Sequence, residues 1–252
     1  MAFPVYVHLL GYRIHLHPFF ETIAYLVSAR LFFRMRKKES APAIPLDVSL
    51  WILGGSIAGA LFGSKVLALL EAPAAYWKDT GEFAGWENGK TIVGGILGGW
   101  LGVEFVKKQL GFRASTGDAF VFPLLLGTAI GRIGCFLTGL SDRTHGVACA
   151  LPWCVDYGDG IQRHPTQLYE IAFLMLYGMC LWLRSRKPHA EGYLFRLYVF
   201  AYLTFRFFVE FIKPRQTVVL ELSAIQMASL LGAGWALWSL RSLRINGLVT
   251  AN

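Results

Sequence analysis

Charged residues are scarce in this sequence. Asp, Glu, Lys and Arg make up 16% of its 252 residues, whereas apolar residues make up 55% and aromatic residues 15%. Soluble domains usually carry about 25% charged residues. The shortage of charge therefore excludes an ordinary soluble domain and predicts an integral membrane protein.

Signals of several other protein classes are missing too. The net charge is +8, but there is no basic stripe with interleaved aromatic residues, which argues against binding of nucleic acid. No internal repeat or low-complexity tract is present. The N-terminus lacks the basic region and the small-residue cleavage site of a signal peptide, so we expect the first apolar span to be retained.

Seven apolar stretches are long enough to cross a bilayer, which requires about 20 mostly apolar residues. They lie at about 18–34, 48–71, 91–106, 119–140, 166–183, 193–212 and 218–240. The sequence therefore predicts an all-α, polytopic membrane protein with residues 1–252 in a single transmembrane domain. The third stretch is short and rich in glycine, which is typical of close helix packing more than of a phosphate-binding loop.

Basic residues gather in alternate loops and predict the orientation. They follow the first, third, fifth and seventh spans: Arg34, Arg36, Lys37, Lys38, Lys107, Lys108, Arg113, Arg184, Arg186, Lys187, Arg241 and Arg244. Segment 72–90 has no cationic excess, and segment 141–165 is mixed. By the positive-inside rule the basic loops are cytoplasmic. We therefore expect the N-terminus outside, the C-terminus inside, and 141–165 as an outer loop between spans 4 and 5.

The four cysteines fall into two pairs. Cys149 and Cys154 lie on the expected outer loop, where a disulfide can form. Two unpaired thiols are an equally good interpretation of this pair. Cys135 and Cys180 fall within spans, and we interpret them as small apolar packing residues.

Two arginines lie inside apolar spans. A charge near the bilayer centre costs roughly 2.5–3.5 kcal/mol on insertion scales, so each requires a partner or a purpose. At 1.5 Å per residue, Arg132 in the fourth span and Arg206 in the sixth both lie roughly 20 Å from the cytoplasmic end. The guanidinium fork matches phosphate well. We therefore predict a clamp that binds the phosphate of an anionic phospholipid.

Other polar residues are expected near this depth. Four charged ones are Glu21, Lys65, Glu170 and Glu210. Tyr202, Arg206 and Glu210 are four residues apart, which puts them on one helix face that we expect to line a polar cavity. The alternative is that the charges only brace the bundle as ion pairs. Those pairs would be Glu210 with Arg206, and Glu21 or Glu170 with Lys65 or Arg132.

Titratable residues at the outer side are candidates for proton transfer. His17 and Glu21 are one turn apart at the start of the first span, and Asp142, His145 and His164 follow on the outer loop. Histidine titrates near neutral pH, which suits general acid–base chemistry. Interfacial polar residues with no catalytic role are the alternative. No compact ligand motif is present, so we predict neither a metal nor a cofactor.

Three segments of the sequence resemble the signatures of a known family and occur in the same order and with the same spacing. Residues 131–139 read GRIGCFLTG, residues 163–170 read RHPTQLYE, and residues 206–211 read RFFVEF. They resemble the G-R-x-G-N-F-x-N-G, R-H-P-S-Q-L-Y-E and R-F-F-x-E-F signatures of the prolipoprotein diacylglyceryl transferase family. Asp118, the Gly63-Ser64-Lys65 segment and the Gly94-Gly95 pair extend the likeness from span 1 to span 6.

The resemblance implies a multi-pass enzyme of the bacterial cytoplasmic (inner) membrane. Such an enzyme takes phosphatidylglycerol, moves its diacylglyceryl group to the cysteine thiol of an exported lipoprotein precursor, and releases glycerol phosphate. It also implies catalytic roles for Arg132, Arg206 and Tyr202. The substrate-binding residues expected are Lys65, Gly94, Gly95, Gly131, Gly134, His164, Gln167, Glu170 and Glu210.

The chain departs from the family pattern at three places. Val93 stands where the family has the histidine of H-G-G, and Glu21 stands where it has the tyrosine of W-Y-G. Cys135 replaces the first asparagine of the arginine signature, and the G-E-L-W-G that should follow has become Gly139-Leu140-Ser141-Asp142. We therefore expect phosphate binding at the arginines to be retained and Glu21, aided by a histidine, to transfer the proton.

Three alternatives remain open from the sequence. The chain could be a related phospholipid-using transferase with a different acceptor. It could be a binding or transport protein that holds an anionic lipid without chemistry, which the changes at Val93 and Cys135 favour. It could also be a structural membrane bundle, in which substitution of the arginines alters stability only.

Overall fold

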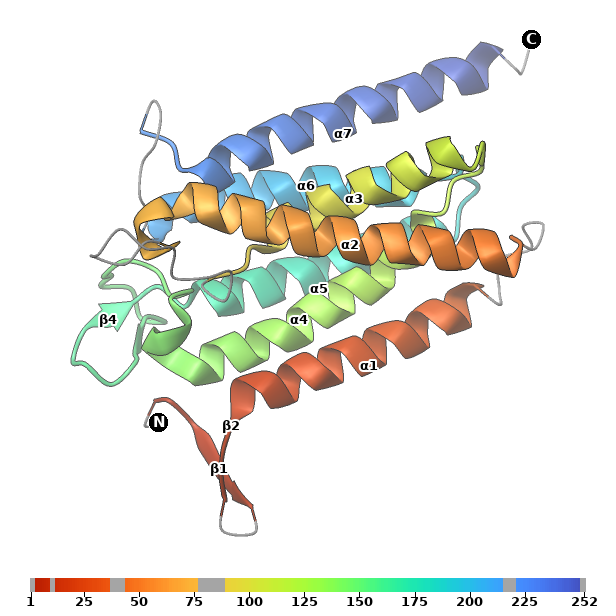
Figure 1. The fold of residues 1–252 in the computed structure, drawn as a ribbon. Coiled ribbons are helices and arrows are strands. Elements are labelled where there is room, and N and C mark those ends of the chain that lie inside the picture. Colours follow the sequence, from red (N-terminus) through yellow and green to blue (C-terminus); the bar gives the residue numbers. More distant parts are fainter. Residues whose placement is uncertain (1–2, 10–11, 37–43, 77–88, 215–220, 250–252) are drawn as a thin grey trace. The chain divides into compact units, whose positions relative to one another are not determined.

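The computed structural model describes residues 3–9, 12–36, 44–76, 89–214 and 221–249 (Figure 1). Seven α-helices lie within these residues: α1 Leu16–Arg36, α2 Leu46–Glu71, α3 Ile92–Gln109, α4 Val121–Thr138, α5 Thr166–Ser185, α6 Tyr193–Val209 and α7 Ala224–Val249. Each coincides with a predicted span. By length and composition, Leu46–Glu71, Asp118–Asp142 and Thr166–Ser185 can each cross a membrane. The chain is a helical membrane protein; the number of crossings stays a prediction.

The chain divides into two compact units. The first unit comprises residues 1–40, 116–198 and 211–214, and the second unit comprises residues 41–115, 199–210 and 215–252. Helices α1, α4 and α5 belong to the first unit, and α2, α3 and α7 to the second. Helix α6 supplies Tyr193–Tyr198 to the first and Val199–Val209 to the second.

In the first unit, α4 lies between α1 and α5 and contacts both (Figure 1). Helix α1 approaches α4 closely, because the Ser28 hydroxyl donates a hydrogen bond to the Pro123 carbonyl at 2.9 Å. Gly127 makes this possible, since a Cβ there would lie on the Ser28 hydroxyl. A hairpin of β1 Tyr6–Leu9 and β2 Tyr12–His15 leads directly into α1. The hairpin was not predicted from the sequence, because its apolar residues merge with the first span.

The loop after α4 is tied down along its length. It contains η3 Gly139–Asp142, β3 Val155–Asp156 and β4 Gln162–Arg163. A disulfide joins Cys149 to Cys154, with their Cα atoms 6.3 Å apart, which confirms the bridged interpretation. The Val147 amide donates to the Ile212 carbonyl at 2.8 Å and so fixes the loop to the segment after α6.

In the second unit, glycines bring α2 and α3 into backbone contact. Three on each helix, spaced by four, face each other: Gly55, Gly59 and Gly63 on α2, and Gly94, Gly98 and Gly102 on α3. A Cβ added at Gly59 would lie 2.2 Å from the Gly98 carbonyl oxygen, and one at Gly98 would lie 2.2 Å from the Gly59 oxygen. This confirms the packing interpretation of the glycine-rich third span.

Helix α7 begins later than predicted. The predicted span starts at residue 218, but the helix starts at Ala224, and residues 218–220 lie outside the described residues. Ser223 and Gln226 form a reciprocal cap: the Gln226 amide donates to the Ser223 hydroxyl at 3.2 Å, and the Ser223 amide donates to the Gln226 side chain at 3.0 Å. This capping box sets the helix start, whereas hydropathy reports only apolar length. Lys37, Lys38 and residues 77–88, used for the orientation, also lie outside the described residues.

Candidate functional site

The first unit contains a buried ion pair between α4 and α5. Arg132 Nε lies 2.9 Å from Glu170 Oε2, and the two side chains are only 7% and 3% exposed. Two charges with so little exposure require each other, because either alone would be costly to bury. The bracing alternative left the partner of Arg132 open between Glu21 and Glu170, and the structure shows it to be Glu170.

The second unit contains a similar pair on one helix face. Arg206 donates through Nη2 to Glu210 Oε2 at 2.9 Å. Tyr202, one turn earlier, is fully buried, and Arg206 and Glu210 are buried too. The pairing of Arg206 with Glu210 that the bracing alternative included is confirmed, and this face is buried in protein. The polar cavity expected beside it stays a prediction. Arg132 and Arg206 belong to different units, so the clamp that would join them stays a prediction.

A polar cluster surrounds the start of α1. His17 Nε2 lies 3.9 Å from Glu21 Oε2, and its Nδ1 lies 3.7 Å from Asp142 Oδ1. The Tyr25 hydroxyl donates to Glu21 Oε1 at 2.8 Å, which fixes that carboxylate from its other side. The sequence placed His17, Glu21 and Asp142 on the same side of the membrane, and the structure brings them into contact.

Cys135 also belongs to this cluster and was not predicted as functional. The ligand atoms of His17, Cys135 and Asp142 all lie within 4.8 Å of one another. Arg132 Nη1 lies 3.9 Å from Cys135 Sγ, because the two residues are three apart on α4. Two features of the sequence could have indicated a functional Cys135: its position three residues after Arg132, and its place where the family has an asparagine. The packing interpretation of Cys135 used neither of them.

Local backbone features bring these residues together. Gly134 lets the start of α1 approach α4, since a Cβ there would lie 2.9 Å from Phe20 Cβ. At the end of α4, Gly139 adopts a φ of 71°, which begins the turn of η3 and returns Asp142 toward the helix. A β-carbon is strained in that conformation, so glycine is required at 139.

Two predicted substrate-binding residues have structural partners on the outer loop. Gln167 is buried, donates through Nε2 to the Thr144 hydroxyl at 3.1 Å, and accepts from the Tyr157 hydroxyl at 3.0 Å. His164 Nδ1 lies 3.1 Å from the Tyr169 hydroxyl. These contacts give both residues a role in holding the loop on α5.

His145 lies on the same loop in an environment that favours the neutral ring. Burial lowers the pKa of His145, and the charge of Arg163 lowers it further. Among the described residues its buried Nδ1 atom has no hydrogen-bond partner. His145 is therefore a neutral group near pH 7, which is the form required of a base.

Of the remaining predicted substrate-binding residues, two make close contacts within the protein and two leave room for a Cβ atom. Lys65 donates to the Gly89 carbonyl at 2.9 Å, and Gly94 is a packing position against Gly63. By contrast, a Cβ at Gly95 would meet only ordinary contacts from 3.8 Å, and one at Gly131 would meet no atom within 4 Å. Gly131 therefore borders open space.

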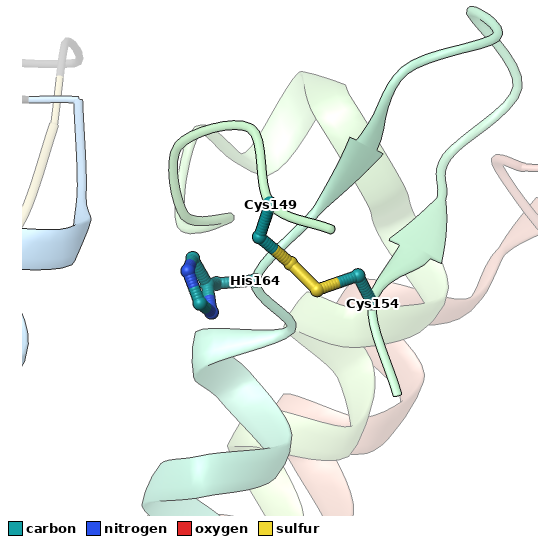
Figure 2. A group of neighbouring side chains, drawn as sticks. All are labelled: Cys149, Cys154 and His164. Carbon is teal, nitrogen blue, oxygen red and sulfur yellow. A yellow bond between two sulfur atoms is a disulfide. The ribbon is translucent and has the colours of Figure 1, made fainter. Parts of the chain in front are cut away.

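A second group of potential metal ligands contains two cysteines that are joined in a disulfide. Figure 2 shows the His164 ring beside the disulfide of Cys149 and Cys154. The three ligand atoms are close enough for a metal. Neither sulfur is a thiolate while the bridge is intact, so this group does not supply metal ligands.

Comparison with known proteins gives one family. The sequence profile described as "Prolipoprotein diacylglyceryl transferase" matches residues 4–241. A phosphatidylglycerol–prolipoprotein diacylglyceryl transferase of Bordetella parapertussis is 36% identical over 166 residues, which are 62% of this chain and 61% of that protein. Proteins with the same name from Pseudomonas paraeruginosa and Nitratidesulfovibrio vulgaris are 33% identical over 172 residues and 34% identical over 168, covering 66% and 62% of this chain. The chain spans 61% or 62% of the length of these relatives.

Proposed function

The chain belongs to the prolipoprotein diacylglyceryl transferase family, and on that premise we propose that it transfers a diacylglyceryl group from phosphatidylglycerol to an acceptor thiol, namely the cysteine of an exported lipoprotein precursor. The names of the relatives support both substrates. In this reaction the thiolate sulfur attacks the glycerol carbon that bears the phosphate. A carbon–sulfur bond forms, the carbon–oxygen bond breaks, and glycerol phosphate leaves with the bonding electrons.

The observation that carries the proposal is that both arginines of the family signatures form buried ion pairs with glutamates of these signatures. Arg132 pairs with Glu170, and Arg206 pairs with Glu210, each at 2.9 Å. A leaving phosphate needs cationic hydrogen-bond donors that are already in place. The glutamates hold the guanidinium groups in fixed orientations, and Tyr202 adds a hydroxyl on the Arg206 face.

Proton transfer from the acceptor thiol is assigned to the cluster at the start of α1. Glu21 lies 3.9 Å from His17, and Tyr25 holds its second oxygen. Glu21 is the proton acceptor, and His17 aids it by electrostatic coupling. His145 and His164 lie on the same loop and complete the set of candidates for relaying the proton.

The membrane arrangement proposed is seven spans in the bacterial cytoplasmic membrane, with the N-terminus outside. The positions of the seven helices and the alternation of basic loops support it. This arrangement places the disulfide-bonded loop and the His17–Glu21 cluster on the outer side, where an exported precursor arrives.

The test is turnover of the purified protein with phosphatidylglycerol vesicles and a peptide containing a lipoprotein-type cysteine. We expect thioether-linked lipid on the peptide and an equal amount of released glycerol phosphate. Arg132→Lys and Arg206→Lys should each lower turnover at least about 100-fold, since a point charge loses the fork geometry. The exposed Arg186→Lys serves as the matched control and should retain full activity.

The same assay separates the alternatives. Release of glycerol phosphate without a modified peptide would assign a different acceptor. If neither product forms and intact phosphatidylglycerol remains bound on native mass spectrometry, the chain is a lipid-binding protein and the transferase proposal is wrong.

A further inference from the structure

Three different metal-ligating side chains converge at the outer end of the first unit. His17 comes from the first turn of α1, Cys135 from the last turns of α4, and Asp142 from η3. Their ligand atoms all lie within 4.8 Å of one another. We propose that these three residues bind a zinc ion, whose open fourth position takes a thiolate.

The spacing fits tetrahedral coordination. Zinc bonds of about 2.0–2.3 Å place neighbouring ligand atoms about 3.4–3.6 Å apart. His17 Nδ1 and Asp142 Oδ1 are already 3.7 Å apart. Cys135 Sγ lies within 4.8 Å of a ligand atom of each of these two residues. The three ligand atoms therefore need to move by only about 1 Å, through side-chain rotation, to bind one ion.

The atoms that do not face the ion are held by a second layer of contacts. With Nδ1 toward Asp142, His17 presents Nε2 to Glu21 at 3.9 Å, the carboxylate–histidine arrangement that orients zinc ligands. Asp142 Oδ2 accepts from the Thr144 hydroxyl at 2.6 Å. Thr144 in turn accepts from the buried Gln167. The Thr144 and Gln167 contacts orient Asp142 in the absence of a metal, and Glu21 lies beside the far nitrogen of His17.

The ligand types select the metal. A thiolate and an imidazole favour zinc over magnesium or calcium, which prefer oxygen ligands. The Cys135 thiolate and the Asp142 carboxylate together balance the charge of the ion. Arg132 lies 3.9 Å from Cys135 Sγ and stabilises the thiolate, while Glu170 balances Arg132 itself.

The open coordination position can bind and deprotonate the acceptor thiol, a role that rests on the proposed transferase function. Three protein ligands leave one tetrahedral position for an external group, as in catalytic zinc sites. A thiol that coordinates zinc is deprotonated outright. Its proton passes to solvent or Glu21. The sulfur then attacks the glycerol carbon that bears the phosphate, the carbon–oxygen bond breaks, and glycerol phosphate leaves with the bonding electrons. The site would thereby supply thiolate in a chain that has Val93 where its family has a histidine.

The test uses Co²⁺ as a spectroscopic probe of the full-length protein in detergent, without reductant so that the Cys149–Cys154 bridge stays intact. We expect one equivalent to bind, with a thiolate-to-cobalt charge-transfer band and the visible absorption of tetrahedral cobalt. Zn²⁺ should displace it. His17→Ala and Asp142→Asn should each weaken binding by more than about 10-fold, and Thr144→Ala by about 10-fold.

Two cysteine variants make this test decisive. Cys135→Asn restores the family residue and should fold normally but lose the charge-transfer band. Cys180→Ser removes the other free cysteine and should keep the band. Absence of the band in the unaltered protein, or its survival in the Cys135→Asn variant, would refute the metal site whatever the transferase assay shows.

A peptide titration tests the thiol role separately. A cysteine peptide should intensify the charge-transfer band of the cobalt-loaded protein, and the matching serine peptide should leave it unchanged. If both peptides leave it unchanged, the metal does not activate the acceptor thiol. Transferase turnover that persists in metal-free protein would likewise rule out activation by the metal, while leaving the proposed function intact.

Discussion

At the scale of single residues, the Arg132–Glu170 pair combines structural and chemical roles. Glu170→Ala leaves the guanidinium buried without its carboxylate, and we expect a loss of about 3–5 kcal/mol in the free energy of unfolding. The measurement is unfolding in mixed detergent micelles. Asp47→Ala is the control: its side chain is exposed near the start of α2, so the loss should stay within about 1 kcal/mol. Equal losses in both variants would contradict the buried-pair interpretation.

A double substitution separates the two roles of this pair. Arg132→Met with Glu170→Leu replaces two buried charges by apolar groups of similar volume, which is often neutral or stabilising. We expect it to recover most of the stability lost in Glu170→Ala and to remain inactive. Recovery of turnover would mean that Arg132 contacts no substrate.

His145 gives a pH dependence. Its folded-state pKa lies below the ordinary value of about 6.5. As the pH falls, the unfolded chain therefore takes up the proton first, and stability is lost below about pH 6.5. His145→Gln removes this contribution, so the variant should lose less stability than the unaltered protein between about pH 7 and pH 5. Thermal unfolding across that range measures it, and identical pH profiles would show that the ring is protonated freely in the fold.

Residue patterns indicated one of the two ion pairs and missed the cluster. Arg206 and Glu210 are four apart on one helix, so spacing sufficed for that pair, whereas Glu21 and Glu170 both remained open as the partner of Arg132. The approach of Cys135 to His17 depends on the close packing at Gly134, and that of Asp142 on the turn at Gly139. Such contacts arise from tertiary structure, which periodicity in one segment does not encode.

At the scale of elements, the glycine contact between α2 and α3 makes a sharp prediction. Gly98→Ala places a Cβ 2.2 Å from the Gly59 oxygen, so the helices must separate. We expect a loss of about 1–3 kcal/mol in unfolding free energy, as for other overpacked positions. Gly95→Ala on the same helix meets nothing closer than 3.8 Å and should be neutral or slightly stabilising. Similar effects of the two substitutions would argue against backbone contact.

Helix positions were predicted well, and helix ends less so. Apolar length located all seven helices, because a spanning segment must satisfy its own backbone hydrogen bonds. The start of α7 depends instead on the Ser223–Gln226 cap, and the N-terminal hairpin on local pairing of Tyr6–Leu9 with Tyr12–His15. Neither feature changes the hydropathy of the segment that contains it.

At the scale of the whole molecule, the disulfide provides a test of orientation. After mild reduction of intact cells, a membrane-impermeant thiol reagent should label Cys149 and Cys154. Lys108→Cys introduces a cysteine at an exposed position in the last turn of α3. This cysteine should react with the reagent only after the cells are permeabilised. The physical reason is the basic last turn of α3, which contains Lys107 and Lys108 and which the positive-inside rule places in the cytoplasm. The reverse labelling pattern would invert the proposed arrangement.

The glycine contact between α2 and α3 has a consequence for lipid traffic. Backbone touches backbone at Gly59 and Gly98, so no side chain there can swing aside to open a passage. An acyl chain is wider than the gap that such a contact leaves. Ile57, Leu61 and Phe62 of α2 are exposed and can contact acyl chains. The glycine contact lets lipid pack against α2 but not pass between α2 and α3. On the proposed function, a lipid substrate therefore enters and leaves by a route other than between α2 and α3.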